Sequence, residues 1–207
     1  MSIKIRNAEP ADASFLAEMI LQSTRAGKKR GLFDLLFDGN DESKLMQMLS
    51  QLTLTEAKSH CNYRNFLIAE IDAKRVGTLC SYEPRISTKE TFIKALEEIG
   101  CTKDVEATLD VVYSCSFEQH RSTLMFDFME EVEDVVDVGV LKALMQKSLL
   151  SARLKGYRVA QTIIEIGSLE AELFYKTLGF SKTDEVLCEE YKEIFGRPGL
   201  MLMSMEF

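Results

Sequence analysis

The stretch that decides the fold begins at Met125 and ends in Ser168-Leu-Glu-Ala-Glu-Leu-Phe-Tyr-Lys-Thr-Leu-Gly-Phe180. Along it, the hydrophobic pattern alternates between strand and helix periods. The predicted order is a strand over Leu124–Met129, an acidic loop, a helix over Val140–Lys155 that follows Gly139, a strand over Val159–Ile166 and a second helix. We therefore predict a β-α-β-α unit around which the rest of the chain is arranged.

The second helix presents one face made of Ala171, Phe174, Tyr175 and Leu178, and Gly179 supplies a left-handed C-cap. A tyrosine on such a face is most often part of the core, with its hydroxyl satisfied at the edge. A functional Tyr175 would instead hydrogen-bond a leaving group. The spacing alone leaves both interpretations open.

Gly139 marks a turn from strand to helix. A glycine there leaves main-chain N–H groups exposed, and a helix N-terminus favours an anion by about 0.3–1 kcal/mol. Such glycines are common in α/β proteins. The position therefore permits an anionic ligand without identifying one.

The loop before Gly139 is acidic, with carboxylates at Glu130, Glu131, Glu133, Asp134 and Asp137. Carboxylates near a strand end can supply a general base. For any one of them, a solvated position in the loop is the commoner arrangement. The loop is therefore a source of candidate bases and a source of negative charge near Gly139.

Charge and composition exclude several classes of function. The 207-residue chain has a net charge of −8, which argues against nucleic acid, because binding phosphates needs clustered Lys and Arg. Two isolated histidines, His60 and His120, do not make a histidine metal site. The sequence shows neither a signal-peptide core nor a long apolar run. We expect a cytoplasmic protein with no metal, nucleic acid or membrane partner.

The cysteines predict reduced thiols rather than a disulfide framework, because they are odd in number and contain no C-x-x-C pair. They are Cys61, Cys80, Cys101, Cys115 and Cys188. Cys61 follows His60 directly, and adjacent residues in a loop rarely present a usable nucleophilic pair. We interpret that pair as incidental.

The segments before the central unit predict a strand, helices and a hairpin. Strands over Phe66–Ile71 and Val76–Tyr82 are expected to be joined by a four-residue connection, Asp72–Arg75. Thr88 is expected to cap a helix over Lys89–Ile99, and a second helix is expected over Lys103–Phe117. The pair forms an insertion over residues 88–117, which could wall a substrate pocket or serve as structural cover.

The order of elements and two motifs resemble the GNAT (Gcn5-related N-acetyltransferase) superfamily. Ser168–Phe180 resembles the family pattern N-x-x-A-x-x-[LF]-Y-x-x-x-G-F, with Ser168 in the Asn position, and Ile5–Asp12 resembles its opening IR-x-A-x-x-x-D. The resemblance spans nearly the whole chain. It implies an α/β (α+β) GNAT acyltransferase fold, with a mixed central sheet flanked by helices and a helical insertion before the central strand. It also implies a single domain over residues 1–207.

The resemblance implies acetyl transfer from acetyl-CoA to an amine. The family's pyrophosphate loop, [QR]-x-x-G-x-[GA], falls on Val136–Leu141, where only Gly139 matches and Leu141 replaces the small residue. Main-chain amides near Met129–Glu131 would polarise the thioester carbonyl. The donor-binding residues implied are Met129, Glu131, Val138, Gly139, Val140, Leu141, Lys142 and Ser168.

Roles in catalysis follow from the same resemblance. Tyr175 would donate a proton to the departing thiolate, and Asp127, Glu130 or Glu131 would deprotonate the amine. Strand alternation is expected to place Asp127 on the face of Met125 and Met129, opposite the side chains of Phe126 and Phe128.

Three functional alternatives remain at this point. The preferred one is an N-acetyltransferase acting on a small-molecule or protein amine, and a homodimer is compatible with it. The second is a catalytically degraded GNAT-like protein that serves as a binding or regulatory module, because the phosphate loop departs from the family pattern. The third is transfer of a longer acyl group, for which Met46 and Met48 could line a slot, although core filling is the commoner role of such methionines.

Overall fold

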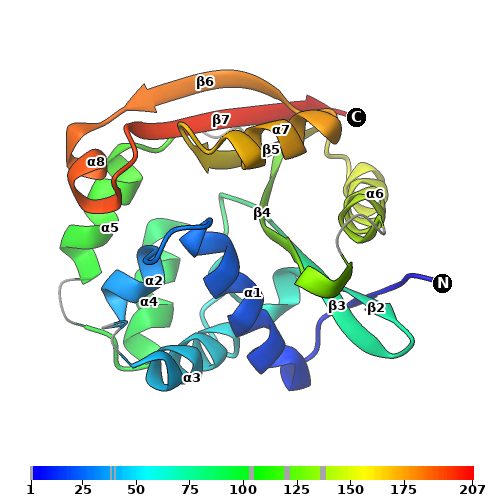
Figure 1. Cartoon of the computed structure of the whole chain (residues 1–207), viewed down its shortest axis with the longest axis horizontal. Helices are drawn as coiled ribbons and strands as arrows, with labels where there is room; N and C mark the ends of the chain where they lie inside the picture. Colours follow the sequence, from blue (N-terminus) through cyan, green and yellow to red (C-terminus); the bar gives the residue numbers. More distant parts are fainter. Residues whose placement is uncertain (1, 38, 40, 103–104, 119–121, 136–138) are drawn as a thin grey trace.

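The computed structural model describes residues 2–37, 39, 41–102, 105–118, 122–135 and 139–207. A seven-stranded mixed sheet runs through it in the order β1-β2-β3-β4-β5-β7-β6 (Figure 1). The strands are β1 (Lys4–Asn7), β2 (Phe66–Ile71), β3 (Lys74–Tyr82), β4 (Thr123–Glu131), β5 (Val159–Glu165), β6 (Ser181–Leu187) and β7 (Gly199–Glu206).

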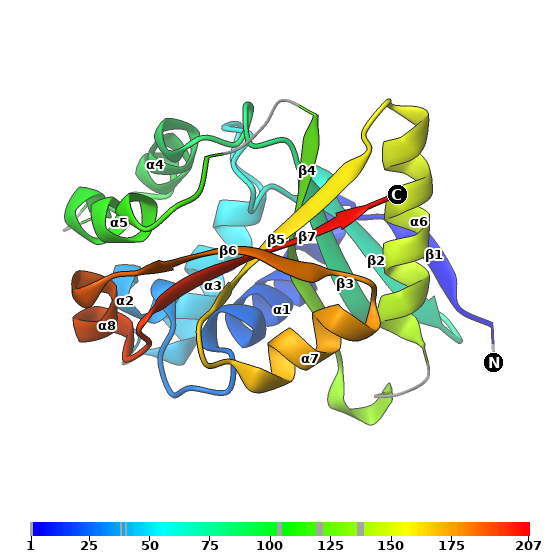
Figure 2. The same cartoon turned by 90° about the horizontal axis from the view of Figure 1, so that it is seen from above.

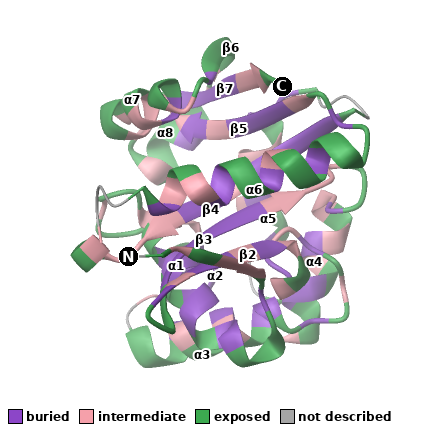
Figure 3. Cartoon of the chain, turned by 90° about the vertical axis from the view of Figure 1, so that its right-hand side faces the viewer, coloured by how far each residue is buried: buried purple, intermediate pink, exposed green. Residues whose placement is uncertain are grey.

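Helices cover both faces of this sheet. They are α1 (Ala13–Arg25), α2 (Leu32–Leu36), α3 (Glu42–Thr53), α4 (Lys89–Glu98), α5 (Val105–Ser114), α6 (Val140–Leu154), α7 (Leu169–Thr177) and α8 (Glu189–Phe195). Figure 2 shows α6 on one side of β3 and β4, with α4 and α5 on the other. In Figure 3, α6 turns an exposed face outward and a buried face toward the sheet, as expected of an amphipathic helix.

Two apolar cores follow from these layers. One core packs α1 to α5 against side chains such as Phe66 and Ile68 of β2. The other packs α6 and α7 against the opposite face, where Ala69 and Ile71 of the same strand point. The alternation along β2 therefore places successive side chains in different cores. None of the helices in the described ranges has both the length and the apolar character needed to span a bilayer.

The central feature of the sheet is the separation of β4 from β5. These strands are parallel and pair only at Thr123–Val159, Leu124–Ala160 and Met125–Gln161. Beyond Met125 they diverge, while β4 stays paired with β3 as far as Glu131. One edge of β4 over residues 126–131 therefore lacks a strand partner in the described part of the chain.

A β-bulge interrupts β4 in this open region. Thr78 pairs with Glu130 but Cys80 pairs with Asp127, so β4 has one more residue than β3 between these pairs. Phe128 has a φ of 45°, in the left-handed region. The expected alternation is therefore wrong past Asp127, because Phe128 packs in the core with α1 and Met129 in the core with α6.

Several element boundaries were predicted well and one connection was not. Strand β2 spans the predicted Phe66–Ile71. Thr88 caps α4, as expected, and its side chain accepts a hydrogen bond from the N–H of Thr91. The hairpin prediction of a four-residue connection is wrong: only Asp72 and Ala73 lie outside the strands, and both have positive φ, as a tight two-residue turn requires.

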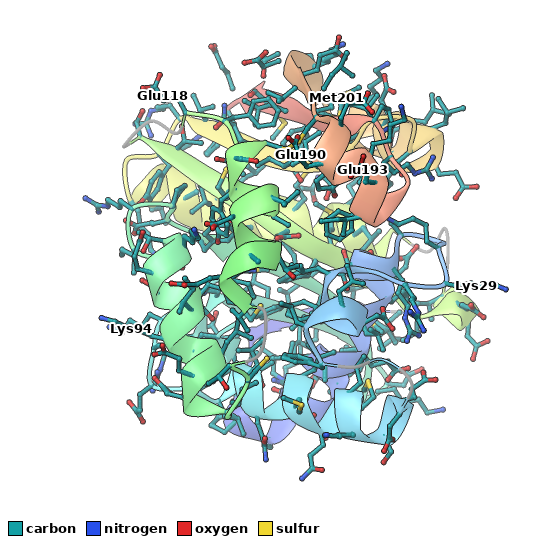
Figure 4. All side chains as sticks on the ribbon, turned by 90° about the vertical axis from the view of Figure 1, so that its left-hand side faces the viewer. Lys29, Lys94, Glu118, Glu190, Glu193 and Met201 are labelled. Carbon is teal, nitrogen blue, oxygen red and sulfur yellow. A yellow bond between two sulfur atoms is a disulfide. The ribbon has the colours of Figure 1, made fainter. Side chains whose placement is uncertain are left out.

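The inserted helices are linked covalently to the segment between β6 and α8. Figure 4 shows α5 beside α8, which carries Glu190 and Glu193. A disulfide joins Cys115, after α5, to Cys188, before α8. The expectation of reduced thiols is therefore wrong for this pair, because 73 residues separate the two cysteines and only the fold brings their Cα atoms to 6.4 Å. Cys61, Cys80 and Cys101 are free and buried.

Gly77 of β3 lets β4 and α6 approach each other. A Cβ atom at this position would lie 2.7 Å from Val140 Cγ1 and 2.9 Å from the main-chain oxygen of Glu130. Both distances are shorter than van der Waals contact. The absence of a side chain at Gly77 therefore helps to set where α6 begins relative to the bulge.

We predict that Gly77→Ala lowers the free energy of unfolding by about 1–3 kcal/mol through overpacking. Val140→Ala removes one of the two clashing groups, so the double variant should be less destabilised than the sum of the single variants. Chemical denaturation of the four proteins in the cycle measures this coupling. Strict additivity would contradict the role assigned to the contact.

Candidate active site

The open edge of β4 is the centre of the candidate site. Backbone N–H and C=O groups inside a protein require partners, from water or a ligand if not from another strand. The edge is bordered by α1 on one face of the sheet and by α6 and α7 on the other. Of the predicted residues, Asp127, Glu130 and Tyr175 all lie close enough to this edge to influence one another electrostatically.

Asp127 is half-buried on the α1 face of β4. Its Oδ1 accepts a hydrogen bond from the N–H of Phe128 at 2.8 Å, a contact that the bulge makes possible. Burial raises the pKa of Asp127 to about 7, against the lowering effect of the Phe128 N–H, and the charge of Glu130 raises it further. A carboxyl group with this pKa can take up and release a proton near neutral pH.

Glu130 and Glu131 are held by the end of α1. Gln22 Nε2 donates to Glu130 Oε2 at 2.9 Å and to the main-chain oxygen of Glu131 at 3.3 Å. Burial raises the pKa of Glu130, while hydrogen bonds from Ser23 and Gln22 lower it. The Glu130 side chain is therefore held by hydrogen bonds, and it adds negative charge near Asp127.

Tyr175 lies on the opposite face of the sheet, in the core formed with α6 and α7. Its ring packs edge-on against Phe174 and Phe180, each with ring centroids at 5.4 Å. Burial raises the pKa of Tyr175 above its ordinary value, and the charges of Asp127 and Glu130 raise it further, against a hydrogen bond from Thr162. The phenol therefore stays protonated and able to donate.

Helix α6 begins with a turn whose N–H groups have no partner inside the helix, as at any helix start. Gly139 is the exposed N-cap, with a φ of 89° and open space where a Cβ would be. Lys142 is exposed, Leu141 is half-buried and Val140 is fully buried. The predicted Val138, together with Val136 and Asp137, lies outside the described residues.

The last two residues predicted to bind the donor differ in their surroundings. Ser168 is the half-buried N-cap of α7, and its side chain makes no capping hydrogen bond. Met129 is 5% exposed, with its side chain in the core, so only its main chain can take part in the site. Met46 of α3 lines a recess between α1 and α3, together with Gln22.

Sequence reasoning missed three side chains near Asp127, namely His60, Tyr82 and Tyr113. Tyr82 and Tyr113 have their pKa raised first by burial and also by the charge of Asp127. The ring of His60 lies 5.6 Å from that of Tyr82. A prediction that β3 pairs with β4 could have placed Tyr82 near Asp127. No local sequence pattern indicates His60 or Tyr113.

Comparisons with solved structures identify the fold. An N-acetyltransferase from Staphylococcus aureus Mu50 superposes with a TM-score of 0.70 at 15% identity, over 99% of this chain and 100% of the other. PaiA N-acetyltransferase from Thermoplasma acidophilum, in complex with coenzyme A, gives a TM-score of 0.57 at 14% identity over 100% of both chains. An acetyltransferase assigned to the GNAT family, from Desulfovibrio desulfuricans, gives 0.56 at 15% identity, over 99% of each chain.

These identities are low, so the likeness concerns the fold. No protein-family model matches the sequence, and no curated protein matches it. The chain has the mixed α/β fold of GNAT acetyltransferases, which confirms the fold predicted from the Ser168–Phe180 motif.

The pKa of Asp127 leads to a prediction for Asp127→Asn. The folded pKa, about 7, lies above the ordinary 3.8, so the folded state binds more protons than the unfolded state between these values. Stability therefore falls as the pH rises through this window. Asparagine keeps an acceptor for the Phe128 N–H but carries no charge. The difference in free energy of unfolding between the variant and wild type should therefore favour the variant more at pH 8 than at pH 4, by on the order of 2–4 kcal/mol.

Chemical denaturation at both pH values measures this effect. Asp184→Asn is a matched control, because the exposed Asp184 also accepts a hydrogen bond from the next N–H, at 2.8 Å. It shows what the loss of an exposed carboxylate with the same hydrogen bond does to stability. An Asp127→Asn effect that is equal at pH 4 and pH 8 would contradict the assigned pKa.

Proposed function

We propose that this protein is an acetyl-CoA-dependent N-acyltransferase that acts on an amine. The observation that carries the proposal is the open edge of β4, with Asp127 on one face and Tyr175 on the other. An acid and a base on opposite sides of an unpaired strand edge suit a reaction in which one group gains a proton and another loses one.

Asp127 has the properties of the base. Its pKa of about 7 lets it accept a proton from an ammonium or from an attacking amine near neutral pH. The bulge fixes the carboxylate against the N–H of Phe128. Glu130 is engaged by Gln22, so its role is to raise the proton affinity of Asp127 through its charge.

The edge of β4 and Tyr175 would act on the acyl group. Acetyl-CoA would supply a thioester, whose C–S bond breaks as the amine nitrogen bonds to the carbonyl carbon. Main-chain N–H groups near Met129–Glu131 are suited to stabilise the carbonyl oxygen. Because a thiol has a pKa of about 8.5, a tyrosine with a raised pKa is better suited to hydrogen-bond the thiolate than to give up its proton fully.

The start of α6 fits the diphosphate of coenzyme A in two respects. Gly139 is exposed with open space around it, and the exposed Lys142 adds a positive charge in the first turn. Two exposed carboxylates that precede Gly139 in the sequence, Glu133 and Asp134, would oppose an anion there. Donor binding by Val138, Val140, Leu141 and Ser168 belongs to the same proposal.

These exposed carboxylates favour a second candidate, a GNAT-like binding or regulatory module that does not use acetyl-CoA. The half-buried Leu141, in place of a small residue, points the same way. Several expectations from the sequence remain predictions. They are transfer of a longer acyl group, the single domain, the cytoplasmic location, the homodimer and the absence of metal, nucleic acid and membrane partners.

Calorimetric titration with acetyl-CoA separates the two candidates. We expect saturable binding, and no heat at millimolar ligand would remove the enzyme proposal. Replacing Glu133 and Asp134 by Gln and Asn should tighten binding by about threefold to tenfold at low salt, because like charges near the diphosphate are removed. The control pair Glu97→Gln and Glu106→Gln makes the same charge change on the exposed faces of α4 and α5. Equal effects of both pairs would contradict a phosphate site at α6.

Tyr175→Phe tests the hydrogen bond to the leaving group. We expect kcat to fall by about tenfold to a hundredfold while the dissociation constant of acetyl-CoA stays nearly unchanged, because the contact forms as the thiolate develops. The matched control is Tyr157→Phe, which removes the hydroxyl of another buried tyrosine, one that interacts with Glu83. An unchanged kcat for Tyr175→Phe would remove this role.

A further inference from the structure

The α1 face of β4 carries a carboxylate beside a row of uncharged side chains. Asp127 pairs across the sheet with Cys80, and Met125 pairs with Tyr82 on one side and Gln161 on the other. Residues that pair directly across strands point to the same face. Tyr82, Met125 and Gln161 therefore form a row next to Asp127, on the side of the sheet that faces the inserted helices.

Several aromatic rings cluster on the same side of the sheet as Asp127. The ring of His60 lies 4.6 Å from Phe92 of α4, 5.6 Å from Tyr82 and 5.7 Å from Phe128, measured between centroids. Tyr113 of α5 is close enough to Asp127 for the carboxylate charge to raise its pKa, after the larger effect of burial. Both inserted helices thus contribute an aromatic residue.

Accessible surface remains within this group. Asp127, His60, Tyr82 and Tyr113 are half-buried rather than fully buried, although burial shifts the pKa of each. Each of these residues therefore keeps some surface that a small ligand can reach.

Gln161 adds an unused hydrogen-bond acceptor in the same row. It is 8% exposed, and its Nε2 donates to Ser204 Oγ at 2.9 Å. Its Oε1 has no hydrogen-bond partner in the described structure. A buried acceptor without a partner is costly, so a donor from a ligand would be favoured nearby.

The charges in this group have one sign. The neighbouring charge that acts on Asp127 is that of Glu130, and no Lys or Arg of the described residues affects its pKa. Burial lowers the pKa of His60 to about 4, so its ring is neutral at physiological pH. Burial raises the pKa of the Cys61 and Cys80 thiols, which are neutral too. Asp127 can therefore attract a cation, and no Lys or Arg in the described ranges acts on it to compensate an added anion.

We infer that this face of β4 binds a primary monoamine whose remainder is aromatic or aliphatic and carries no carboxylate. The nitrogen lies at Asp127, and the apolar part lies among the rings of His60, Tyr82 and Tyr113. The inference rests on the proposed function, in which this amine is the acyl acceptor.

The same chemistry disfavours two other classes of amine. An amino acid would place its carboxylate near Asp127 and Glu130, where no Lys or Arg of the described part of the chain acts on Asp127 to compensate the added charge. A polyamine would leave its second ammonium among neutral rings, where cation–π contacts compensate desolvation only in part. The rings and the carboxylate of Asp127 together select for a lone amine on an apolar group.

Three ligands test this selectivity by calorimetry at pH 8, in the absence of acetyl-CoA. The probes are 2-phenylethylamine, L-phenylalanine, which adds a carboxylate, and 1,5-diaminopentane, which replaces the ring by a second amine. We expect the last two to bind at least about tenfold more weakly than 2-phenylethylamine. Equal binding of either one, or no binding of 2-phenylethylamine, would overturn the inference.

Variants then locate the site. Asp127→Asn should weaken the binding of 2-phenylethylamine by about tenfold or more, and Tyr113→Ala by about threefold or more, with Tyr113→Phe restoring affinity. Tyr63→Ala is the control, because it removes another half-buried tyrosine of the same core, stacked on Arg64. A loss in Tyr63→Ala equal to that in Tyr113→Ala would overturn the assigned position.

The two proposals can fail separately. If 2-phenylethylamine binds as expected but is not acetylated with acetyl-CoA present, the proposed function is wrong and the amine site stands. If L-phenylalanine is acetylated in preference, the proposed function stands and the acceptor class is wrong.

Discussion

The structure depends on the early separation of β4 from β5. Parallel strands that continued to pair would satisfy each other's backbone and close the sheet. Here pairing stops after Met125, and the bulge at Phe128 turns β4 so that adjacent side chains enter different cores. The strand is then anchored from both faces while one edge stays open. A backbone edge without a strand partner inside a layered protein is a feature that a ligand can complete.

Electrostatics around this edge work against stability. Asp127 would ionise more easily in water, and the fold raises its pKa by desolvation and by the charge of Glu130. Tyr175, across the sheet, is affected by the same two carboxylates. Perturbed groups that act on each other through an open strand edge are more typical of a functional site than of a structural core. The bulge connects both features, because it supplies the N–H that holds the Asp127 carboxylate.

The features of the fold that depend on neighbouring residues were predicted from the sequence. The span of β2 and the Thr88 cap follow from patterning and capping chemistry, and both were confirmed. The left-handed Phe128 was not predictable, since positive φ is rare for a bulky aromatic residue and no local pattern marks it. The two-residue hairpin turn was missed for a related reason, because alanine at a left-handed position is unusual. The Cys115–Cys188 pairing and the rings near Asp127 arise from contacts distant in sequence, which no local pattern encodes.

Access to the two faces differs, and this bears on the route of the reaction. On the α1 face, Gln22 holds Glu130 of β4 and Lys28, shortly after α1, pairs with Glu165 of β5, so the end of α1 links the diverging strands. In the proposed reaction, a bulky donor would therefore be better accommodated from the face of α6 and α7, which would leave the face of Asp127 to the amine. A cysteine intermediate would require a thiolate near the edge, yet burial and the charge of Asp127 raise the pKa of both Cys61 and Cys80. Under the proposed function, direct attack of the amine on the thioester is the route that would agree with both the access and the charges.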